Sequence, residues 1–297
     1  MVNNLFKNGK LILLRRQSNI LSAAFVIMVT VFASRILGLV RDRLLAGAFF
    51  GGNEWLLDTY FAAFRIPDMI FQLLVLGALS AAFIPVFSEY LTKNEKEAYQ
   101  ISSSVINIVL LFFIIIAALT FIYADQLCRL IAPTFSPERI NLMVDLTRIM
   151  LLAQLFFCFS NFLTGVIQSH QRFLVPALSP VVYNLGIIFG IVFLVPIWGI
   201  YGPTIGVVIG AVLHLLVQLP LAIRLGFVYQ FRAWHFTHPG VKEIARLMLP
   251  RTLALGINQI EATVAVFIAT SLAVGSLSIF YFAQHLMNVP VGLFGST

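Results

Sequence analysis

The sequence is poor in charge and in cysteine, and both shortages limit what the protein can be. Only 10% of its 297 residues are charged, whereas 60% are hydrophobic. Soluble globular domains are typically about one quarter charged, so this composition excludes a soluble fold. The two cysteines, Cys128 and Cys158, fall in a predicted loop and a predicted apolar helix. They are poorly placed for a disulfide and show no metal-ligand spacing.

Motifs that carry enzymatic chemistry are also missing. The sequence contains no HExxH motif, no phosphate-binding P-loop, no nucleophile elbow and no paired acidic metal motif. We therefore expect a protein that is not an enzyme and that holds no cofactor or metal. The formal charge of +7 could suggest nucleic acid. However, the basic residues mostly lie between apolar segments, where the topology of a membrane protein accounts for them, so we expect no nucleic-acid partner.

Long apolar segments dominate the chain instead. A helix that crosses a bilayer needs about 20 residues, and helices satisfy their own backbone groups in hydrocarbon. The sequence therefore predicts an all-α, polytopic transmembrane helical bundle with about eight spans. The expected spans are residues 20–49, 56–91, 101–124, 142–169, 173–198, 203–225, 247–274 and 277–297.

The distribution of Lys and Arg predicts the orientation of these spans. Eleven lie in the segments assigned to the inner side and two, Arg129 and Arg139, in those assigned to the outer side. Positively charged loops stay in the cytoplasm, so we expect a multi-pass membrane protein with a cytoplasmic N-terminus. Residues 1–19 are expected to form an amphipathic lead on the cytoplasmic surface, and residues 92–98 a charged inner loop.

The same layout predicts the domain organisation. Residues 20–226 form an N-terminal six-helix bundle, residues 227–246 a cytoplasmic linker, and residues 247–297 two further helices. The last of these helices ends in VGLFGST, without a charged flank or polar tail. We therefore expect the chain to be truncated at its C-terminus.

Charged residues inside the first two spans are the strongest functional signal. Arg35, Arg41, Asp58 and Arg65 lie within otherwise apolar sequence. A charge at such a depth costs about 2.5 to 3.5 kcal/mol, so these side chains are expected to face a partner or a water-filled cavity. If the two spans fold back on each other about Gly52, all four fall within a few helical turns of depth.

Two interpretations of this cluster remain open. Ser34, Gly38 and Arg41 share one helix face. In the first interpretation, arginines outnumber carboxylates in this cluster, so its net positive charge would bind an anion such as a phosphate or diphosphate. Alternatively, the charges are structural ion pairs that lock the two spans together, namely Arg35 with Asp42 and Arg65 with Asp58 or Asp68. In either case Gly38 and Pro67 are candidate hinges, since proline removes a helical hydrogen bond.

Several segments resemble one known family. The sequences SRILGLVRDRLLA, YFAAFRIPD after Asp58, and GALSAAFIPVFSEY are similar to the MurJ/MviN-type lipid II flippases of the multidrug/oligosaccharidyl-lipid/polysaccharide exporter superfamily. PALSPVVYNLG and FYFAQHLMNVPVGLFG extend the resemblance over nearly the whole chain. Relatives have about fourteen helices in two bundles. The resemblance therefore implies that this chain holds the first six-helix lobe and the first two helices of the second.

The resemblance also implies a function. The chain would move lipid II, a lipid-linked peptidoglycan precursor, from the inner to the outer leaflet by alternating access. Arg35, Arg41 and Asp58 match family positions that line a cationic cavity for the diphosphate head, and Ser34 and Arg65 join them as substrate-binding candidates. The resemblance implies a location in the bacterial inner membrane. Its expected partners are lipid II and membrane lipid, and the full-length protein is expected to be monomeric.

Three departures from the family pattern bear on the head group. Phe71 and Leu76 replace a common arginine and a common acid, and Gln284-His285 replaces a frequent Asp-Arg pair. His285 is thus a candidate pH-dependent substitute for a basic residue. Glu261, with Asn258, is a possible site for a coupling cation or proton, although a hydrogen bond in helix packing is an alternative.

Other functions stay open from the sequence alone. One alternative is an exporter of another lipid-linked oligosaccharide or of an amphipathic drug. The arginine excess speaks against a drug-cation exporter, which should carry more acid than base in its cavity. A second alternative is a structural membrane scaffold that uses these charges only for packing.

Overall fold

The computed structural model of the chain describes residues 20–77 and 82–294. The expected amphipathic lead over residues 1–19 lies outside this part. Within it, the regular structure is entirely helical, which confirms the all-α prediction. In chain order the elements are α2 (Ile20–Phe49), α3 (Glu54–Phe71), the π-helical turn η1 (Gln72–Leu76), α4 (Ile84–Lys93), α5 (Glu95–Ile122), α6 (Ala124–Ile131), α7 (Pro137–Ser169), α8 (Leu174–Phe189), the π-helical turn η3 (Gly190–Leu194), α9 (Val195–Trp198), α10 (Tyr201–Arg224), α11 (Pro239–Thr270) and α12 (Ser276–Phe294).

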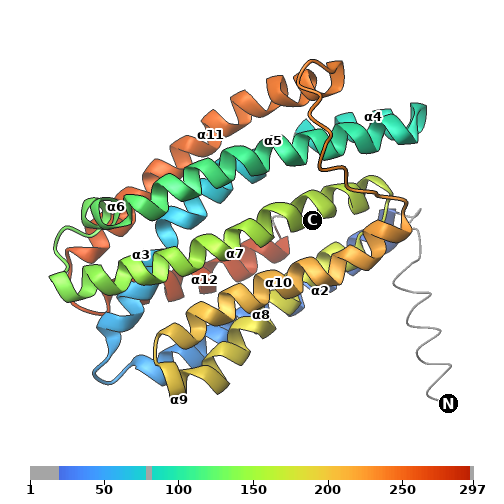
Figure 1. Cartoon of the computed structure of the whole chain (residues 1–297). Coiled ribbons are helices and arrows are strands. Elements are labelled where there is room, and N and C mark those ends of the chain that lie inside the picture. Colours follow the sequence, from blue (N-terminus) through green and yellow to red (C-terminus); the bar gives the residue numbers. More distant parts are fainter. Residues whose placement is uncertain (1–19, 78–81, 295–297) are drawn as a thin grey trace, which may run out of the picture.

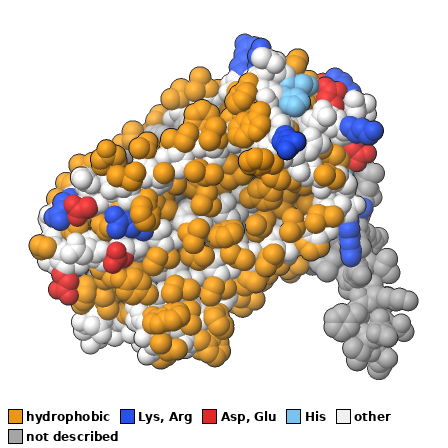
Figure 2. Space-filling view, viewed as in Figure 1, with side chains coloured by type: hydrophobic (Ala, Val, Ile, Leu, Met, Phe, Trp, Pro, Cys, Tyr) orange, Lys and Arg blue, Asp and Glu red, His pale blue; other side chains and the backbone are white. Residues whose placement is uncertain are grey.

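The surface is that of a membrane protein. Six helical segments of the described chain are long and apolar enough to cross a bilayer: Glu54–Leu76, Glu95–Ile122, Pro137–Ser169, Leu174–Trp198, Tyr201–Arg224 and Pro239–Thr270. Hydrophobic side chains form a broad band between two ends at which the charged side chains gather (Figure 2). About eight spans were expected. The described part of α2 carries four charged residues, Arg35, Arg41, Asp42 and Arg43, which sets it apart from the six.

The helices form two groups with α7 and α12 between them (Figure 1). In this view α4, α5 and α11 lie on one side, and α2, α8 and α10 lie on the other. Helix α7 packs against α10, α3 and α5, while α12 packs against α2 and α3. The chain therefore places α2 and α12, which are far apart in sequence, next to each other.

Close packing of α8 on α10 depends on glycines spaced four residues apart. A Cβ atom on Gly186 would lie 2.4 Å from the backbone of Gly210, and one on Gly190 would lie 2.5 Å from the Gly202 carbonyl oxygen. Small residues at this spacing let helix backbones approach in lipid, where no hydrophobic effect drives helices together. This interface fixes α8, which forms one wall of the cavity described below.

Several predicted helix boundaries were wrong for local reasons. The second predicted span, 56–91, is not regular α-helix throughout, since the π-helical turn η1 follows α3. Its residues 78–81 lie outside the described part, and helix α4 begins at Ile84. The predicted inner loop 92–98 is helical except at Asn94, whose side chain accepts a hydrogen bond from the backbone N–H of Glu97 and caps α5.

The predicted linker is also shorter than expected. Helix α11 begins at Pro239, with the His238 side chain accepting a hydrogen bond from the backbone of Gly240. The non-helical part before it is tied to α5 by Asn107, whose amide donates to the carbonyl groups of Gln230, Phe231 and Ala233 at 2.8 to 3.1 Å. A proline in the first turn and a cap before it start the helix within the predicted linker.

The predicted pairing of the first two spans was wrong as well. Helix α2 packs mainly on α8 and α12, whereas α3 packs mainly on α7. Figure 1 shows α2 and α3 diverging from the turn that joins them. Because the two helices separate, charges that were expected to pair across a hairpin contact other helices instead.

Candidate functional site

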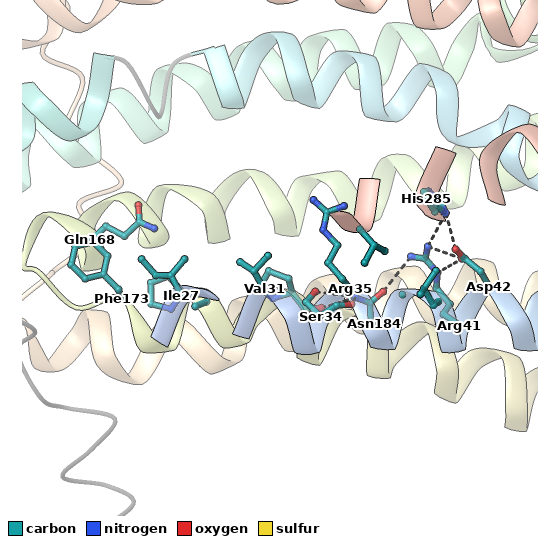
Figure 3. Close-up of a pocket in the computed structure, with 16 residues that line it drawn as sticks. Ile27, Val31, Ser34, Arg35, Arg41, Asp42, Gln168, Phe173, Asn184 and His285 are labelled. Atoms are coloured by element: carbon teal, nitrogen blue, oxygen red, sulfur yellow. Dashed lines mark hydrogen bonds and ion pairs between the residues drawn. The ribbon is translucent and has the colours of Figure 1, made fainter. Parts of the chain in front are cut away.

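A cavity of about 490 Å³ lies between α2, α8 and α12. Its lining runs from Gln168 and Phe173, beside the turn between α7 and α8, to Arg41, Asp42 and His285. Figure 3 shows these two sets of side chains at opposite ends of the cavity, with Arg35 between them. The predicted candidates Ser34, Arg35, Gly38, Arg41 and His285 all line this one space.

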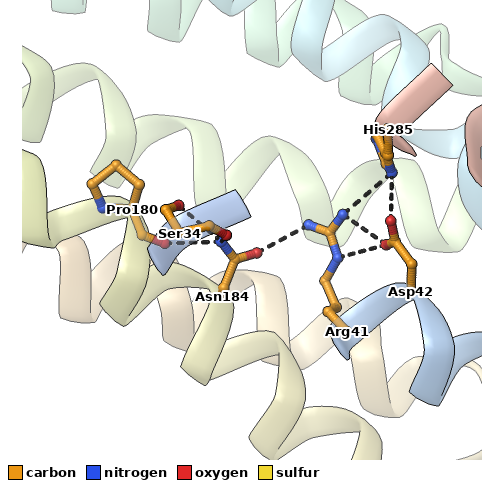
Figure 4. Close-up of polar contacts among 6 residues, drawn as sticks. All are labelled: Ser34, Arg41, Asp42, Pro180, Asn184 and His285. Carbon is orange, nitrogen blue, oxygen red and sulfur yellow. Dashed lines mark hydrogen bonds and ion pairs between the residues drawn. The ribbon is translucent and has the colours of Figure 1, made fainter. Parts of the chain in front are cut away.

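Arg41 is held in a buried polar cluster at one end of the cavity (Figure 4). Its guanidinium contacts Asp42 through Nε at 3.0 Å and Nη2 at 2.8 Å. The other carboxylate oxygen of Asp42 lies 2.8 Å from Nδ1 of His285 on α12. The predicted structural pair of Arg35 with Asp42 is therefore wrong, because Asp42 contacts Arg41 and His285 instead.

Asn184 on α8 completes this cluster. Its side-chain oxygen accepts a hydrogen bond from Arg41 Nη1 at 3.2 Å, and its amide nitrogen donates to the carbonyl groups of Ser34 and Pro180 and to the Ser34 hydroxyl, at 3.1 to 3.3 Å. The amide orientation is fixed because the two carbonyl groups can only accept. Asn184 therefore points its oxygen at Arg41 and ties α8 to α2 (Figure 4).

Arg35 differs from Arg41 in having no fixed partner. It makes no hydrogen bond or ion pair with any residue of the described chain, and its side chain extends into the cavity (Figure 3). Gly38, one turn further along α2, faces the same space, since a Cβ atom there would meet nothing within 4 Å. The guanidinium of Arg35 is thus available to a ligand, and the absence of a side chain at residue 38 leaves room for one.

A second cavity of about 160 Å³ adjoins the first. It shares Arg41 and His285 with the larger cavity and adds Arg65 and Asp68 from α3, together with the tyrosines Tyr60, Tyr183 and Tyr281. The two cavities together are lined by three arginines and two aspartates. With neutral histidine, the combined lining carries a net positive charge and favours an anion.

Arg65 also joins α3 to α11. Its Nε donates to the Thr263 hydroxyl at 2.9 Å, and its Nη2 donates to the backbone and side-chain oxygens of Gln259 at 2.8 and 2.5 Å. The predicted structural pairs of Arg65 with Asp58 or Asp68 are absent among the described residues, where all its hydrogen bonds go to uncharged oxygens. Its charge therefore stays unneutralised by a direct ion pair at the edge of the smaller cavity.

Asp58 was expected beside the arginines of the cavity but lies elsewhere. It lines neither cavity and is only 3% exposed. Its carboxylate accepts hydrogen bonds from the backbone N–H groups of Gly275 and Ser278 at 2.7 and 2.9 Å and from the Ser278 hydroxyl at 2.7 Å. Arg139 approaches it at 3.7 Å. A carboxylate at this position caps the N-terminus of α12 and interacts favourably with the helix dipole.

The two hinge candidates lie in continuous helices. Gly38 is inside the uninterrupted helix α2, and Pro67 is inside α3, in the last part of that helix before the π-helical turn η1 begins at Gln72. Proline cannot donate to the carbonyl group four residues earlier, which belongs to Ala63. The Thr147 hydroxyl of α7 donates to that oxygen at 3.2 Å, so a neighbouring helix satisfies the group that Pro67 leaves free.

The predicted ion-site residues lie apart from the cavities. Asn258 and Glu261 are both exposed on α11, on a face that no described helix covers. Their role as an ion site therefore stays a prediction.

Sequence reasoning missed two members of the site. Asp42 was considered only as a structural partner of Arg35, although its adjacency to Arg41 could have indicated the observed pair. Asn184 lies 143 residues after Arg41, and its only sequence signal was its position in PALSPVVYNLG. Neither the divergence of α2 from α3 nor the packing of α8 on α2 is visible in local sequence.

Comparison with known proteins matches these observations. Residues 45–297 match the family model described as lipid II flippase MurJ. The chain is 32% identical to the probable lipid II flippase MurJ of Buchnera aphidicola subsp. Acyrthosiphon pisum, over 93% of this chain and 55% of that protein. It is 30% identical to the lipid II flippase MurJ of Burkholderia cenocepacia, with the same coverage of both.

Solved structures show the same architecture. A lipid II flippase MurJ in an inward closed conformation superposes with a TM-score of 0.76 at 30% identity, covering 92% of this chain and 56% of that one. A transporter of the MOP superfamily from Pyrococcus furiosus shares the fold at 16% identity and a TM-score of 0.67, over 91% of this chain and 60% of that one. This chain therefore spans about half the length of the relatives it matches. On the strength of the family match over most of its residues, the chain belongs to the MurJ family of lipid II flippases.

Proposed function

We propose that the protein translocates lipid II across the membrane, holding its diphosphate head in the cavity between α2, α8 and α12. The observation that carries this proposal is the pair of guanidinium groups in one cavity. Arg41 is held in place by Asp42 and Asn184, and Arg35 has no partner among residues 20–77 and 82–294. Guanidinium groups match phosphate oxygens in geometry and stay charged when partly desolvated. An amphipathic drug cation would need more carboxylates than arginines in the cavity, and the lining has the reverse.

The shape of the cavity supports binding from the cytoplasmic side. The Lys and Arg distribution assigns the turn at residues 168–173 to the cytoplasm, and Gln168 and Phe173 beside it line one end of the cavity. Contacts between the first six-helix part and the last two helices lie at the opposite end of the molecule. There Asp58 holds the N-terminus of α12, and the Thr134 hydroxyl donates to the Thr270 carbonyl at 2.7 Å. The head would enter from inside while the polyprenyl tail remains in lipid.

Outward release then requires these closing contacts to separate. Helices α11 and α12 would be the first two helices of the second bundle. Rocking of that bundle against residues 20–226 would break the contacts of Asp58 and Thr134. In this proposal the full-length protein acts as a monomer. Asn258 and Glu261 remain candidates for a coupling-ion site on the exposed face of α11.

Delivery of lipid II to the outer leaflet tests the proposal. With the protein as the sole lipid II transporter in a bacterial cell, Arg35→Ala and Arg41→Ala should each abolish delivery, because each removes a phosphate-binding charge. Arg129→Ala is the matched control, since Arg129 is exposed and pairs with Asp125 away from the cavity. Membrane levels of each variant establish insertion. Wild-type delivery by both cavity variants would reject the proposal.

A further inference from the structure

We propose that His285 takes up one proton when the diphosphate head binds, so that the affinity for the head depends on pH. This inference rests on the proposed function and assigns His285 a specific chemical part in it. Three observations support it: the contact of one ring nitrogen with Asp42, the absence of a partner for the other, and the position of the ring between two cavities.

The contact with Asp42 fixes the tautomer of the imidazole. Nδ1 of His285 lies 2.8 Å from a carboxylate oxygen of Asp42. An ionised carboxylate can only accept a hydrogen bond, so Nδ1 must carry the proton. Arg41 Nη2 lies 3.5 Å from the same nitrogen and is engaged by Asp42 at 2.8 Å. In the neutral ring, the lone pair is therefore on Nε2.

Nε2 is the atom available to a ligand. It makes no hydrogen bond with any residue of the described chain, and the His285 side chain is 33% exposed and lines both cavities. A neutral Nε2 presents a lone pair to an approaching phosphate oxygen, which repels it. A protonated Nε2 donates a hydrogen bond and adds a positive charge beside Arg41. The anion therefore binds more tightly when the ring carries the second proton, which the bulk solvent supplies.

The other ionisable groups that line the two cavities with His285 come from α2, α3, α8 and α12. They are Arg35, Arg41 and Asp42 on α2, Tyr60, Arg65 and Asp68 on α3, Tyr183 on α8, and Tyr281 on α12 itself, whose ring centroid lies 6.2 Å from that of His285. Arginine stays charged throughout the neutral range, and the ordinary pKa of tyrosine lies near 10. The two aspartates are the remaining competitors for a pH effect, and the experiment must separate them from His285.

The dissociation constant for lipid II, measured on the purified chain between about pH 6 and 8, tests the inference. The diphosphate of lipid II is a diester and keeps its charge across this range. For the wild-type chain, we expect affinity to weaken with rising pH, by up to about tenfold per pH unit. His285→Arg should bind with the affinity of the acidic wild-type protein at every pH, because its charge is permanent. His285→Gln should bind weakly at every pH.

His214→Gln is the matched control, because His214 is a histidine buried in a separate network with Ser160 and Gln218. It should keep the pH dependence of the wild-type chain. A wild-type affinity that does not change with pH, or a pH dependence that persists in His285→Arg, would overturn the inference and, in the second case, point to the aspartates. The dissociation constant for undecaprenol, measured under the same conditions, separates the role of His285 from the proposed function. Failure of the wild-type chain to prefer lipid II over undecaprenol would reject the proposed function itself.

Discussion

Among single residues, the arginines of α2 differ in what surrounds them, and this difference defines their roles. Arg41 is oriented by Asp42, Asn184 and His285, so it presents its charge in a fixed position. Arg35 extends into the cavity without such support. A site with one guanidinium held by protein groups and one without protein partners among the described residues can hold one phosphate in a fixed position and contact a second part of the head.

Replacing Asn184 tests whether the fixed position of Arg41 matters. Asn184→Leu removes the acceptor for Arg41 Nη1, so we expect lipid II to bind about tenfold more weakly, as for the loss of one hydrogen bond to a charged group, ~1.5 kcal/mol. Asn107→Leu is the control, because Asn107 is also buried and also donates to backbone carbonyl groups, but far from the cavity. Equal losses of affinity in both variants would show a general effect of destabilisation.

Substitutions of Gly38 test whether this glycine leaves space in the cavity or lets helix α2 bend. Since nothing lies within 4 Å of a Cβ atom there, Gly38→Ala should fold normally and raise stability by roughly 0.5–1 kcal/mol. Gly38→Leu should also fold but should block lipid II binding by filling the cavity. Thermal unfolding and titration of both variants check this. If Gly38 is instead a hinge, Gly38→Ala will retain binding and lose delivery.

Among helices, the contact between α3 and the start of α12 is one that the proposed transport cycle must break. Asp58 satisfies two backbone N–H groups of α12, and such caps typically contribute about 1 kcal/mol. Asp58 therefore stabilises one conformation of the protein, and its substitution should shift the balance between conformations.

Asp58→Ala should increase access to the cavity from the outer side while leaving lipid II affinity unchanged. A cysteine at Ser34, which lines the cavity, reports this through its labelling by an impermeant reagent from outside. The native cysteines do not interfere, because both are buried and burial raises the pKa of the Cys128 thiol to about 11. A loss of affinity without a change in labelling would restore the sequence-based interpretation of Asp58 as a ligand for the head.

The helices themselves were largely predictable, since long apolar segments in lipid leave few alternatives to a helix. The arginines were also identifiable as candidate site residues, because a charge inside an apolar segment is costly unless it faces a partner or water. Their partners were not predictable. Asp58 meets α12, Arg65 meets α11 and Arg41 meets Asn184, each through contacts between helices far apart in sequence. Such contacts depend on helix packing. For α8 and α10 the glycines four residues apart are visible in the sequence, but the sequence does not show which helix packs against which.

For the chain as a whole, the account depends on an anion-binding cavity that opens toward the turn at residues 168–173. The family match supports this interpretation. The chain spans about half the length of the relatives that it matches. The first lobe would supply Arg35 and Arg41, whereas α12 would supply His285 from the second. Binding of the head would therefore occur at the contact between the two parts that must move during transport.

Titration of the purified chain in lipid nanodiscs with lipid II and with undecaprenol tests this account most directly. The two ligands share a polyprenyl tail, so their difference in affinity reports recognition of the charged head. We predict that the wild-type chain binds lipid II at least about tenfold more tightly than undecaprenol, and that the variant with both Arg35→Ala and Arg41→Ala loses this preference. Equal affinity of the wild-type chain for both ligands, or an unchanged preference in the double variant, would contradict the account.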